Sequence, residues 1–253
     1  MKIVVAIKQV PARNSLLKVD ESAKWIDDTD LSWEINEPDA YALEAGLQLR
    51  EAAAGEVVVL CAGPDRATQT IREALAKGAD RAIHIETDET AADPLALAHA
   101  MANALEAEKP DIVLTGLQSD DLGYGQTGVI LAEVMGYAHA TLVMRIEIIA
   151  DGIRVKRELE DGWFQHVEMP LPAVLTIQSG AAKLRYATLM GIKKAKSKEI
   201  RSIAAGSPAA APSVLLERIY LPQKSKRSQI FEGTPQETAA QLVEKLRFEA
   251  RVI

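Results

Sequence analysis

The chain has 253 residues, 48% of them hydrophobic, and a formal net charge of −7. The surplus of acidic groups argues against a general nucleic-acid binder, and aromatic residues at 4% are too few for base-stacking platforms. The single cysteine, Cys61, excludes an internal disulfide and is expected in the core. The sequence shows neither a signal peptide nor an apolar run of about 20 residues, which predicts a soluble cytoplasmic protein without membrane insertion.

The first 135 residues alternate between strand-like and helix-like segments. Continuous apolar runs, typical of buried parallel strands, predict strands at residues 2–7, 56–61, 81–85 and 111–115. Capping residues, prolines and Gly78 predict helices from Asn36 to about residue 53, from Asp65 to residue 77, from Asp93 to about residue 108, and over residues 126–135. Asn36 and Asp65 can each cap the helix that they precede. This alternation predicts an α/β fold with a doubly wound, mainly parallel sheet and helices on both faces.

The pattern changes after residue 140. Strands at residues 141–149, 153–160 and 163–169, separated by two Asp-Gly pairs, predict a small antiparallel meander. A further apolar strand at residues 173–177 can return to the main sheet. Beyond it come a basic stretch, a linker-like segment at residues 204–212, and a capping box from Thr234 to Glu237 that opens a C-terminal helix. The chain is therefore expected to end in an extended arm that carries a helix.

The stretch SDDLGYGQTG, residues 119–128, joins an expected strand to an expected helix. Ligands bind at the carboxyl ends of strands in doubly wound sheets, and a helix start favours phosphate. Glycines at 116, 123 and 125 allow close backbone approach, and the hydroxyls of Ser119 and Thr127 can donate hydrogen bonds. The stretch carries no lysine and matches neither the P-loop nor the dinucleotide-binding pattern. Nucleotide binding and a solvated glycine-rich turn are both left open. The four histidines form no metal-binding or triad spacing.

Several segments together resemble the β subunit of electron transfer flavoprotein, and more closely its bacterial branch. They lie at residues 2–10, 36–39, 62–64, 76–81, 118–128, 155–162, 172–176 and 185–189, and the likeness covers roughly residues 1–200. Leu122 and Gly123 depart from the acidic positions of many relatives, as do residues 179–184 from their usual sequence. The resemblance implies a heterodimer with an α subunit that holds most of the FAD site, while this chain binds a structural AMP. Electrons would pass from a docked dehydrogenase to a downstream acceptor.

The resemblance also implies two sets of site residues. The AMP site would comprise Ala6, Asn36, Glu37, Pro38, Asp39, Ala62, Gly116, Leu117, Gln118, Ser119, Asp120, Asp121, Leu122, Gly123, Tyr124, Gly125, Gln126 and Thr127. The dehydrogenase would dock on a recognition loop at residues 184–196, through Leu184, Arg185, Tyr186, Leu189, Lys193, Lys194 and Lys196, with Leu189 as the anchor. In the alternative interpretation, the basic residues are only a solvated face and Leu189 is packed inside.

The expected organisation is a nucleotide-binding domain over residues 1–200 and a linker, arm and helix over residues 201–253 that pack on the α subunit. The expected role is electron transfer without a catalytic residue or a metal ion on this chain. A first alternative is an electron-bifurcating subunit with a second FAD in place of AMP, which Thr127 disfavours. A second alternative is a stand-alone α/β enzyme that binds or hydrolyses a nucleotide.

Overall fold

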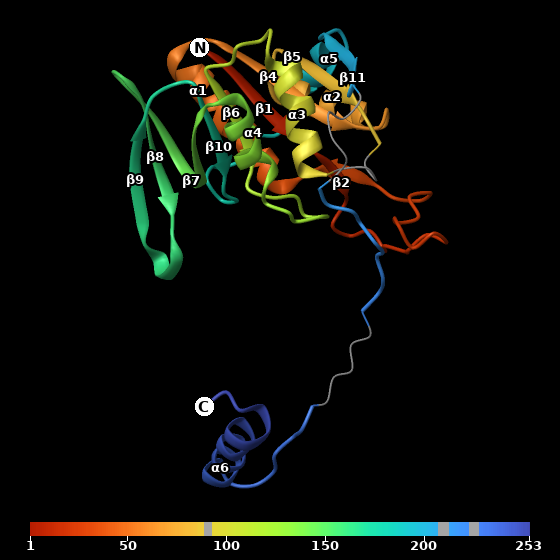
Figure 1. The fold of residues 1–253 in the computed structure, drawn as a ribbon, viewed down its shortest axis with the longest axis vertical. Helices are drawn as coiled ribbons and strands as arrows, with labels where there is room; N and C mark the ends of the chain where they lie inside the picture. The colour runs from red at the N-terminus through yellow and green to blue at the C-terminus, as the bar shows by residue number, and fades with distance from the viewer. Residues whose placement is uncertain (89–92, 207–212, 223–227) are drawn as a thin grey trace. The chain divides into compact units, whose positions relative to one another are not determined.

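The computed structural model of the chain describes residues 1–88, 93–206, 213–222 and 228–253. Part of the expected linker, residues 207–212, lies outside the described residues. The chain divides into two compact units, Met1–Ile219 and Tyr220–Ile253. The larger unit contains a nine-stranded sheet with helices on both faces (Figure 1).

The sheet has the order β11-β5-β4-β1-β6-β10-β7-β8-β9, and every pair of neighbours from β11 to β7 is parallel. The strands are β1 (Lys2–Ile7), β4 (Glu56–Gly63), β5 (Arg81–Glu86), β6 (Ile112–Gly116), β7 (Ala138–Ile149), β8 (Gly152–Glu158), β9 (Phe164–Met169), β10 (Ala173–Ile177) and β11 (Ile200–Ala204). β8 and β9 are antiparallel to their neighbours, so the expected meander continues the main sheet through β7. The predicted fold class is confirmed.

Helices cover both faces of the sheet because its central strands are apolar on both sides. The helices of the larger unit are α1 (Glu37–Ala53), α2 (Ala67–Lys77), α3 (Pro94–Leu105), α4 (Thr127–Met135) and α5 (Leu189–Ala195). Side chains alternate along a strand, so Ile3 and Val5 of β1 join the core with α1 and α2, while Val4 joins the core with α3 and α4. All three side chains are fully buried, and each contributes roughly 1.5–3 kcal/mol to folding. The continuous apolar runs of the sequence reflect this double burial.

One predicted helix start and one predicted helix end differ from the structure, whereas the predicted turns are found. Gly78 ends α2 at a positive φ of 136°, and its N–H bonds the last turn, as predicted. The expected cap at Asp65 is wrong: Arg66 occupies the capping position of α2 and no side chain caps that helix. α3 ends at Leu105, earlier than expected. The second Asp-Gly pair forms the 3-10 turn η2 (Glu160–Gly162) between β8 and β9.

Four elements of the larger unit were not predicted. β2 (Gln9–Pro11) and β3 (Trp33–Ile35) form a separate antiparallel pair. α5 and β11 lie within the basic stretch, and β11 extends the parallel sheet beyond β5 (Figure 1). The many lysines and arginines of this stretch conceal the short apolar alternation at Ile200 and Ile203 that forms the edge strand.

The smaller unit contains α6 (Pro235–Lys245) and a π-helical turn, η3 (Leu246–Ala250). The predicted capping box is confirmed: Glu237 Oε2 accepts from the N–H of Thr234 at 2.8 Å, and the Thr234 hydroxyl accepts from the N–H of Glu237. None of the residues described in this unit is buried. Across the described ranges of the whole chain, no helix combines the length and apolar character needed to span a bilayer.

Candidate functional site

A cleft opens at the carboxyl ends of β1, β4 and β6. Its rim is completed by the starts of α1, α3 and α4. β1 stands at the point where the chain reverses its direction of winding, with β4 on one side and β6 on the other. Ligands of doubly wound sheets bind at this switch point because the loops diverge there and leave a crevice. The cleft is therefore the candidate site.

Asn36 ties the loop of residues 117–126 to the start of α1. Its Nδ2 donates to the carbonyl of Gln118 at 3.0 Å, and its Oδ1 accepts from the N–H of Asp120 at 2.9 Å. Asn36 occupies the capping position of α1, as expected, but its side chain makes no capping bond, because both polar atoms are engaged by the loop. It shapes one wall of the cleft.

Asp39, in the first turn of α1, joins the ends of β1 and β6. One carboxyl oxygen accepts from the N–H of Lys8 at 2.7 Å, and the other accepts from the N–H of Gly116 at 2.9 Å. Only 6% of the residue is exposed. Burial raises the pKa of Asp39 to about 7, although the two N–H groups, Asn36 and the Lys8 ammonium favour the charged form. Asp39 thus places a titratable group next to the cleft.

Lys8 supplies the positive charge that the glycine-rich loop lacks. It follows β1 directly and lines the cleft, and its ammonium pairs with the carboxylate of Asp121 at 2.6 Å. The sequence offered one signal for it, since Lys8 follows a predicted strand end on the same edge of the sheet as the loop.

Two glycines keep the floor of the cleft low. A Cβ on Gly116 would lie 2.3 Å from a carboxyl oxygen of Asp39, and a Cβ on Gly128 would lie 2.6 Å from the hydroxyl oxygen of Thr115. Gly123 and Gly125 adopt φ values of 64° and 63°, a left-handed conformation that glycine tolerates best. The glycines of the loop are therefore required by its shape, as the sequence predicted for a binding loop.

The cleft combines an apolar wall with a polar end. Leu97 and Met101 of α3 and Tyr124 of the loop line it, which suits a flat aromatic base. Gln126 and Thr127 lie at the start of α4, a helix whose first turn has no side-chain cap. Uncapped N–H groups and the helix dipole favour a phosphate there. These surroundings fit a nucleoside monophosphate.

The structure brings most of the expected AMP-site residues to the cleft. Those that line it are Ala6, Asn36, Asp39, Ala62, Gly116, Leu117, Gln118, Ser119, Leu122, Tyr124, Gly125, Gln126 and Thr127. Five others lie beside the lining: Glu37, Pro38, Asp120, Asp121 and Gly123. The sequence did not single out Lys8, Thr87, Pro94, Leu97, Met101, Thr115 or Gly128, which also line the cleft. Those from α3 could not be found from a local motif, because only the packing of α3 beside α4 brings them there.

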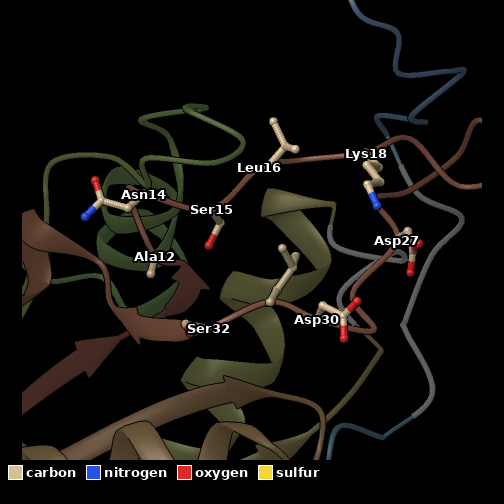
Figure 2. A pocket seen from close by; sticks show the side chains of 9 residues that line it. Ala12, Asn14, Ser15, Leu16, Lys18, Asp27, Asp30 and Ser32 are labelled. Carbon is tan, nitrogen blue, oxygen red and sulfur yellow. The ribbon is translucent and has the colours of Figure 1, made fainter.

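A second hollow lies in the surface loop of residues 12–32 (Figure 2). Its volume of about 350 Å³ exceeds the 130 Å³ of the cleft. One loop supplies all its lining residues, which include Asn14, Leu16 and Asp30, whereas several strand ends and helix starts converge on the cleft. We therefore place the functional site in the cleft.

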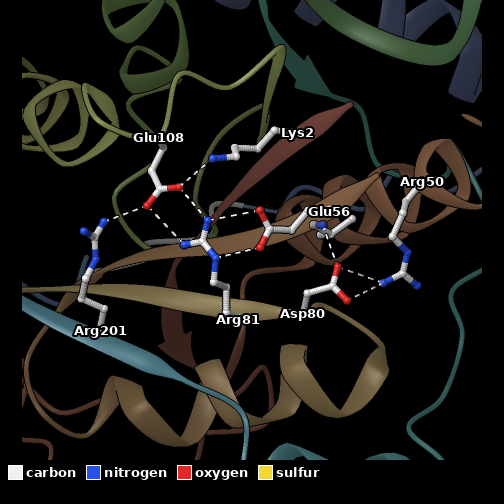
Figure 3. Close-up of polar contacts among 8 residues, drawn as sticks. Lys2, Arg50, Glu56, Asp80, Arg81, Glu108 and Arg201 are labelled. Carbon is white, nitrogen blue, oxygen red and sulfur yellow. Dashed lines mark hydrogen bonds and ion pairs between the residues drawn. The ribbon is translucent and has the colours of Figure 1, made fainter. Parts of the chain in front are cut away.

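The opposite edge of the sheet carries an ion-pair network around Glu108 (Figure 3). Its carboxylate accepts from Lys2 Nζ at 3.2 Å, from Arg81 Nη2 at 2.6 Å and from Arg201 Nη2 at 2.9 Å. These bonds, led by that of Arg81, lower the pKa of Glu108 to about 2. Arg81 also pairs with Glu56. The network joins β11 to the rest of the sheet and leaves its charges paired with one another.

The segment of residues 184–196, which we call the α5 segment, carries the expected docking residues. Leu189, its proposed anchor, is 88% exposed as the first residue of α5, which contradicts the alternative that it is packed inside. Tyr186, Met190 and Ile192 are also exposed. So are the three expected docking lysines, Lys193, Lys194 and Lys196. Leu184 and Arg185 are half-buried, and Arg185 turns toward α1.

Cys61 and His84 do not line the cleft. Cys61 is fully buried, as predicted, and burial raises the pKa of its thiol to about 12, so it is unreactive as a thiolate. His84 is buried, with Nε2 lying 3.0 Å from the carbonyl of Gly63. Within the described residues, no cluster of histidine, cysteine, aspartate and glutamate has metal-binding geometry.

Comparisons with known proteins point to one family. A family model described as the electron transfer flavoprotein domain matches residues 24–208. The chain is similar to electron transfer flavoprotein subunit beta of Methylophilus methylotrophus, with 36% identity over 257 residues that cover 96% of this chain and 97% of the relative. It is also similar to proteins of the same name from Bradyrhizobium diazoefficiens and Syntrophomonas wolfei, with 33% and 35% identity over all of this chain and over 100% and 98% of theirs.

Proposed function

The chain belongs to the electron transfer flavoprotein family, as its sequence predicted, and from this premise we propose how it acts. It is a subunit of an electron carrier and not an enzyme. We propose that it binds AMP as a structural ligand and contributes to the wall of an FAD held mainly by the α subunit. It also docks the dehydrogenase that donates electrons, which then pass to a downstream acceptor.

The switch-point cleft is the observation that carries the AMP proposal. The apolar wall at Leu97, Met101 and Tyr124 would hold the adenine, and the start of α4 with Thr127 would hold the phosphate. Asn36 and Asp39 bond the surrounding backbone, so they fix the loop around the nucleotide. A ligand that touches β1, β4, β6 and three helix starts would stabilise all of them, which is what a structural nucleotide does.

The charges of the cleft support retention of the nucleotide over its hydrolysis. Lys8 is the lysine among the described lining residues, and its ammonium is paired with Asp121. Because this ion pair engages its ammonium, Lys8 affects the overall charge of the cleft instead of acting directly on a phosphate group. Redox chemistry comes from FAD when it is bound to the α subunit, and this chain supplies binding surfaces around it.

The Tyr220–Ile253 unit supports the proposal that the end of the chain packs on the α subunit. Leu242, Val243 and Phe248 are exposed within a unit that buries none of its described side chains. A helix with apolar side chains and no core of its own gains stability from a partner surface. The cytoplasmic location expected from the sequence also stays a prediction.

Identification of the released nucleotides tests the proposal. The αβ complex is purified, denatured by heat, and its nucleotides are separated by chromatography. We expect one AMP for each FAD. Two FAD and no AMP would contradict the AMP proposal and favour the electron-bifurcating alternative. A stable monomer of this chain that turns over ATP would instead favour the stand-alone enzyme.

A further inference from the structure

Arg185 holds the amino-terminal side of the α5 segment against α1. Its Nε donates to Glu44 at 2.8 Å, its Nη1 donates to Glu51 at 2.7 Å, and its Nη2 lies 3.0 Å from Glu44 and 3.3 Å from Glu51. The backbone N–H of Arg185 also donates to Glu44, at 3.2 Å. Glu44 and Glu51 are seven residues apart on α1, so they lie on one face of that helix. The guanidinium thus spans both carboxylates.

The two carboxylates differ in their surroundings. Glu44 is only 5% exposed and also accepts from Gln48 at 2.8 Å, whereas the side chain of Glu51 is half-exposed. Burial alone would raise the pKa of Glu44, but the bonds from Arg185 and Gln48 outweigh it and lower that pKa. A buried carboxylate with several donors gives Arg185 one defined position, which a surface pair of flexible side chains would not.

A second set of contacts holds the carboxyl-terminal side of the segment against α2. Arg72 Nη1 donates to the carbonyls of Ala195 and Lys198 at 2.6 and 2.7 Å. Lys198 Nζ donates to the carbonyl of Leu75 at 3.0 Å and to that of Ala79. Gly191 packs so closely on α2 that a Cβ would lie 2.3 Å from the carbonyl oxygen of Ala76. Leu189 lies between these two attachments.

We infer that Arg185 is a positioning residue for docking: its bonds to Glu44 and Glu51 fix the turn before α5, so Leu189 is presented to the dehydrogenase in one orientation. The inference rests on the proposed docking role of the α5 segment. Each nitrogen of the guanidinium donates to α1, so Arg185 itself is committed inward. A fixed anchor strengthens binding because the entropy of ordering the segment is lost on folding and not on docking.

Hydrogen exchange and steady-state kinetics on the whole αβ complex test this inference. The electron donor is the member of a panel of purified flavin-dependent dehydrogenases that reduces the wild-type complex fastest. We expect Arg185→Gln to raise the KM for the complex about tenfold, with kcat within about twofold, because free segments must be ordered at each encounter. Amide exchange over residues 186–192 should accelerate, while the AMP and FAD contents stay unchanged.

Lys183→Gln is the matched control, since it removes the same charge from an exposed position two residues away. It should leave amide exchange unchanged and alter KM by less than about threefold, which measures the loss of electrostatic steering alone. Arg185→Lys keeps the charge but cannot span two carboxylates, so it should behave like Arg185→Gln. If Arg185→Gln does not assemble, Glu51→Gln replaces it, because that change leaves no buried charge unpaired.

Unchanged exchange over residues 186–192 in these variants would overturn the inference. So would equal KM values for Arg185→Gln and Lys183→Gln. Leu189→Ala separates this failure from that of the proposed function. If Leu189→Ala raises KM and Arg185→Gln does not, only the positioning role is lost. If Leu189→Ala leaves KM unchanged, the docking role of the segment fails, and the inference fails with it.

Discussion

The two edges of the sheet each contain a carboxyl group that is almost inaccessible to solvent, and they hold it in opposite ways. Asp39, at the carboxyl edge, is 6% exposed and bonds two backbone N–H groups, while Glu108, at the amino edge, is 9% exposed and bonds three cationic side chains. The pKa of Asp39 rises to about 7 and that of Glu108 falls to about 2. The deeper burial of Asp39 and the cationic partners of Glu108 together set these charge states, because desolvation raises the pKa of a carboxyl group and full positive charges lower it.

The same difference explains why the amino edge is filled by paired side chains while the carboxyl edge has a cleft. At the amino edge, side chains pair with one another and hold neighbouring strands together. At the carboxyl edge, Asn36 and Asp39 bond loop backbone, so they shape a cleft without filling it. A ligand can enter only where the local groups are satisfied and space remains, which is the case at the carboxyl edge.

The largest expected effect is the pH dependence that comes from Asp39. Its pKa in the folded chain lies above the ordinary value of 3.8, so its neutral form is favoured by folding. The stability that this group contributes is fully present below about pH 4 and is lost as pH rises through about 7. The wild-type free energy of unfolding should therefore lose about 2–4 kcal/mol from this group over that range.

Asp39→Asn cannot titrate, so its free energy of unfolding should change less between pH 4 and pH 8 than that of the wild type. Chemical denaturation of the αβ complex, followed across this range at constant salt, measures the difference. The variant Asp121→Asn, which changes a carboxylate paired with Lys8 outside the cleft lining, is the control. Parallel pH profiles for Asp39→Asn and the wild type would show that Asp39 is ionised throughout.

The second expected effect lies at the amino edge and has the opposite sign. The folded pKa of Glu108 is below its ordinary value of 4.5, so its contribution is present above about pH 4.5 and is lost as pH falls through about 2. Glu108→Gln should lower the free energy of unfolding at pH 7 by about 2 kcal/mol and flatten the acid limb of the profile. The AMP content should stay at the wild-type level, because the network lies at the far edge of the sheet.

Glu147→Gln provides the control for Glu108→Gln. Glu147 pairs with Arg145 on the exposed face of β7, where an ion pair contributes less than about 1 kcal/mol. If both glutamine variants lose the same stability, the burial of Glu108 has no special role. If Glu108→Gln also loses AMP, the two edges are coupled, and the separation drawn between them is wrong.

Much of the fold could be predicted because local signals decided it. The apolar runs of β1, β4 and β6 and the Asp-Gly turns of the meander depend on neighbouring residues alone. The strand ends and the glycines of the 117–126 loop then placed the cleft. The sequence showed that the loop carries no lysine. It did not show that Lys8 pairs with Asp121 of the loop, because the two residues are 113 positions apart in the sequence. Contacts at that separation leave no periodic signal.

The α5 segment shows the same limit more clearly. Its composition showed a basic stretch, the family resemblance implied an exposed Leu189, and Leu189 is exposed. α5 and β11 were missed because α5 has seven residues and β11 has five, and each is specified by packing against α2 or β5. Arg185 bonds Glu44, from which it is separated by 141 positions in the sequence. The sequence shows that Arg185 is charged, but only the fold shows that its guanidinium points toward Glu44 and Glu51.

The smallest expected effect on stability comes from replacing Lys8. This residue forms the kind of side-chain ion pair that is found at the amino edge, but it lies at the carboxyl edge. Its ammonium makes a side-chain ion pair with Asp121, as the groups at the amino edge do, but both partners are partly exposed. Lys8→Gln should therefore change the free energy of unfolding by less than about 1 kcal/mol.

The main effect of Lys8→Gln should be on ligand binding, because the cleft loses its lysine charge and an anionic nucleotide would be held less tightly. We expect less AMP per FAD after extended dialysis, with Lys18→Gln, on the 12–32 loop, as the charge control. Equal AMP retention in both variants would mean that N–H groups and hydroxyls alone hold the phosphate, and the carboxyl edge would then bind its ligand without using a cationic side chain.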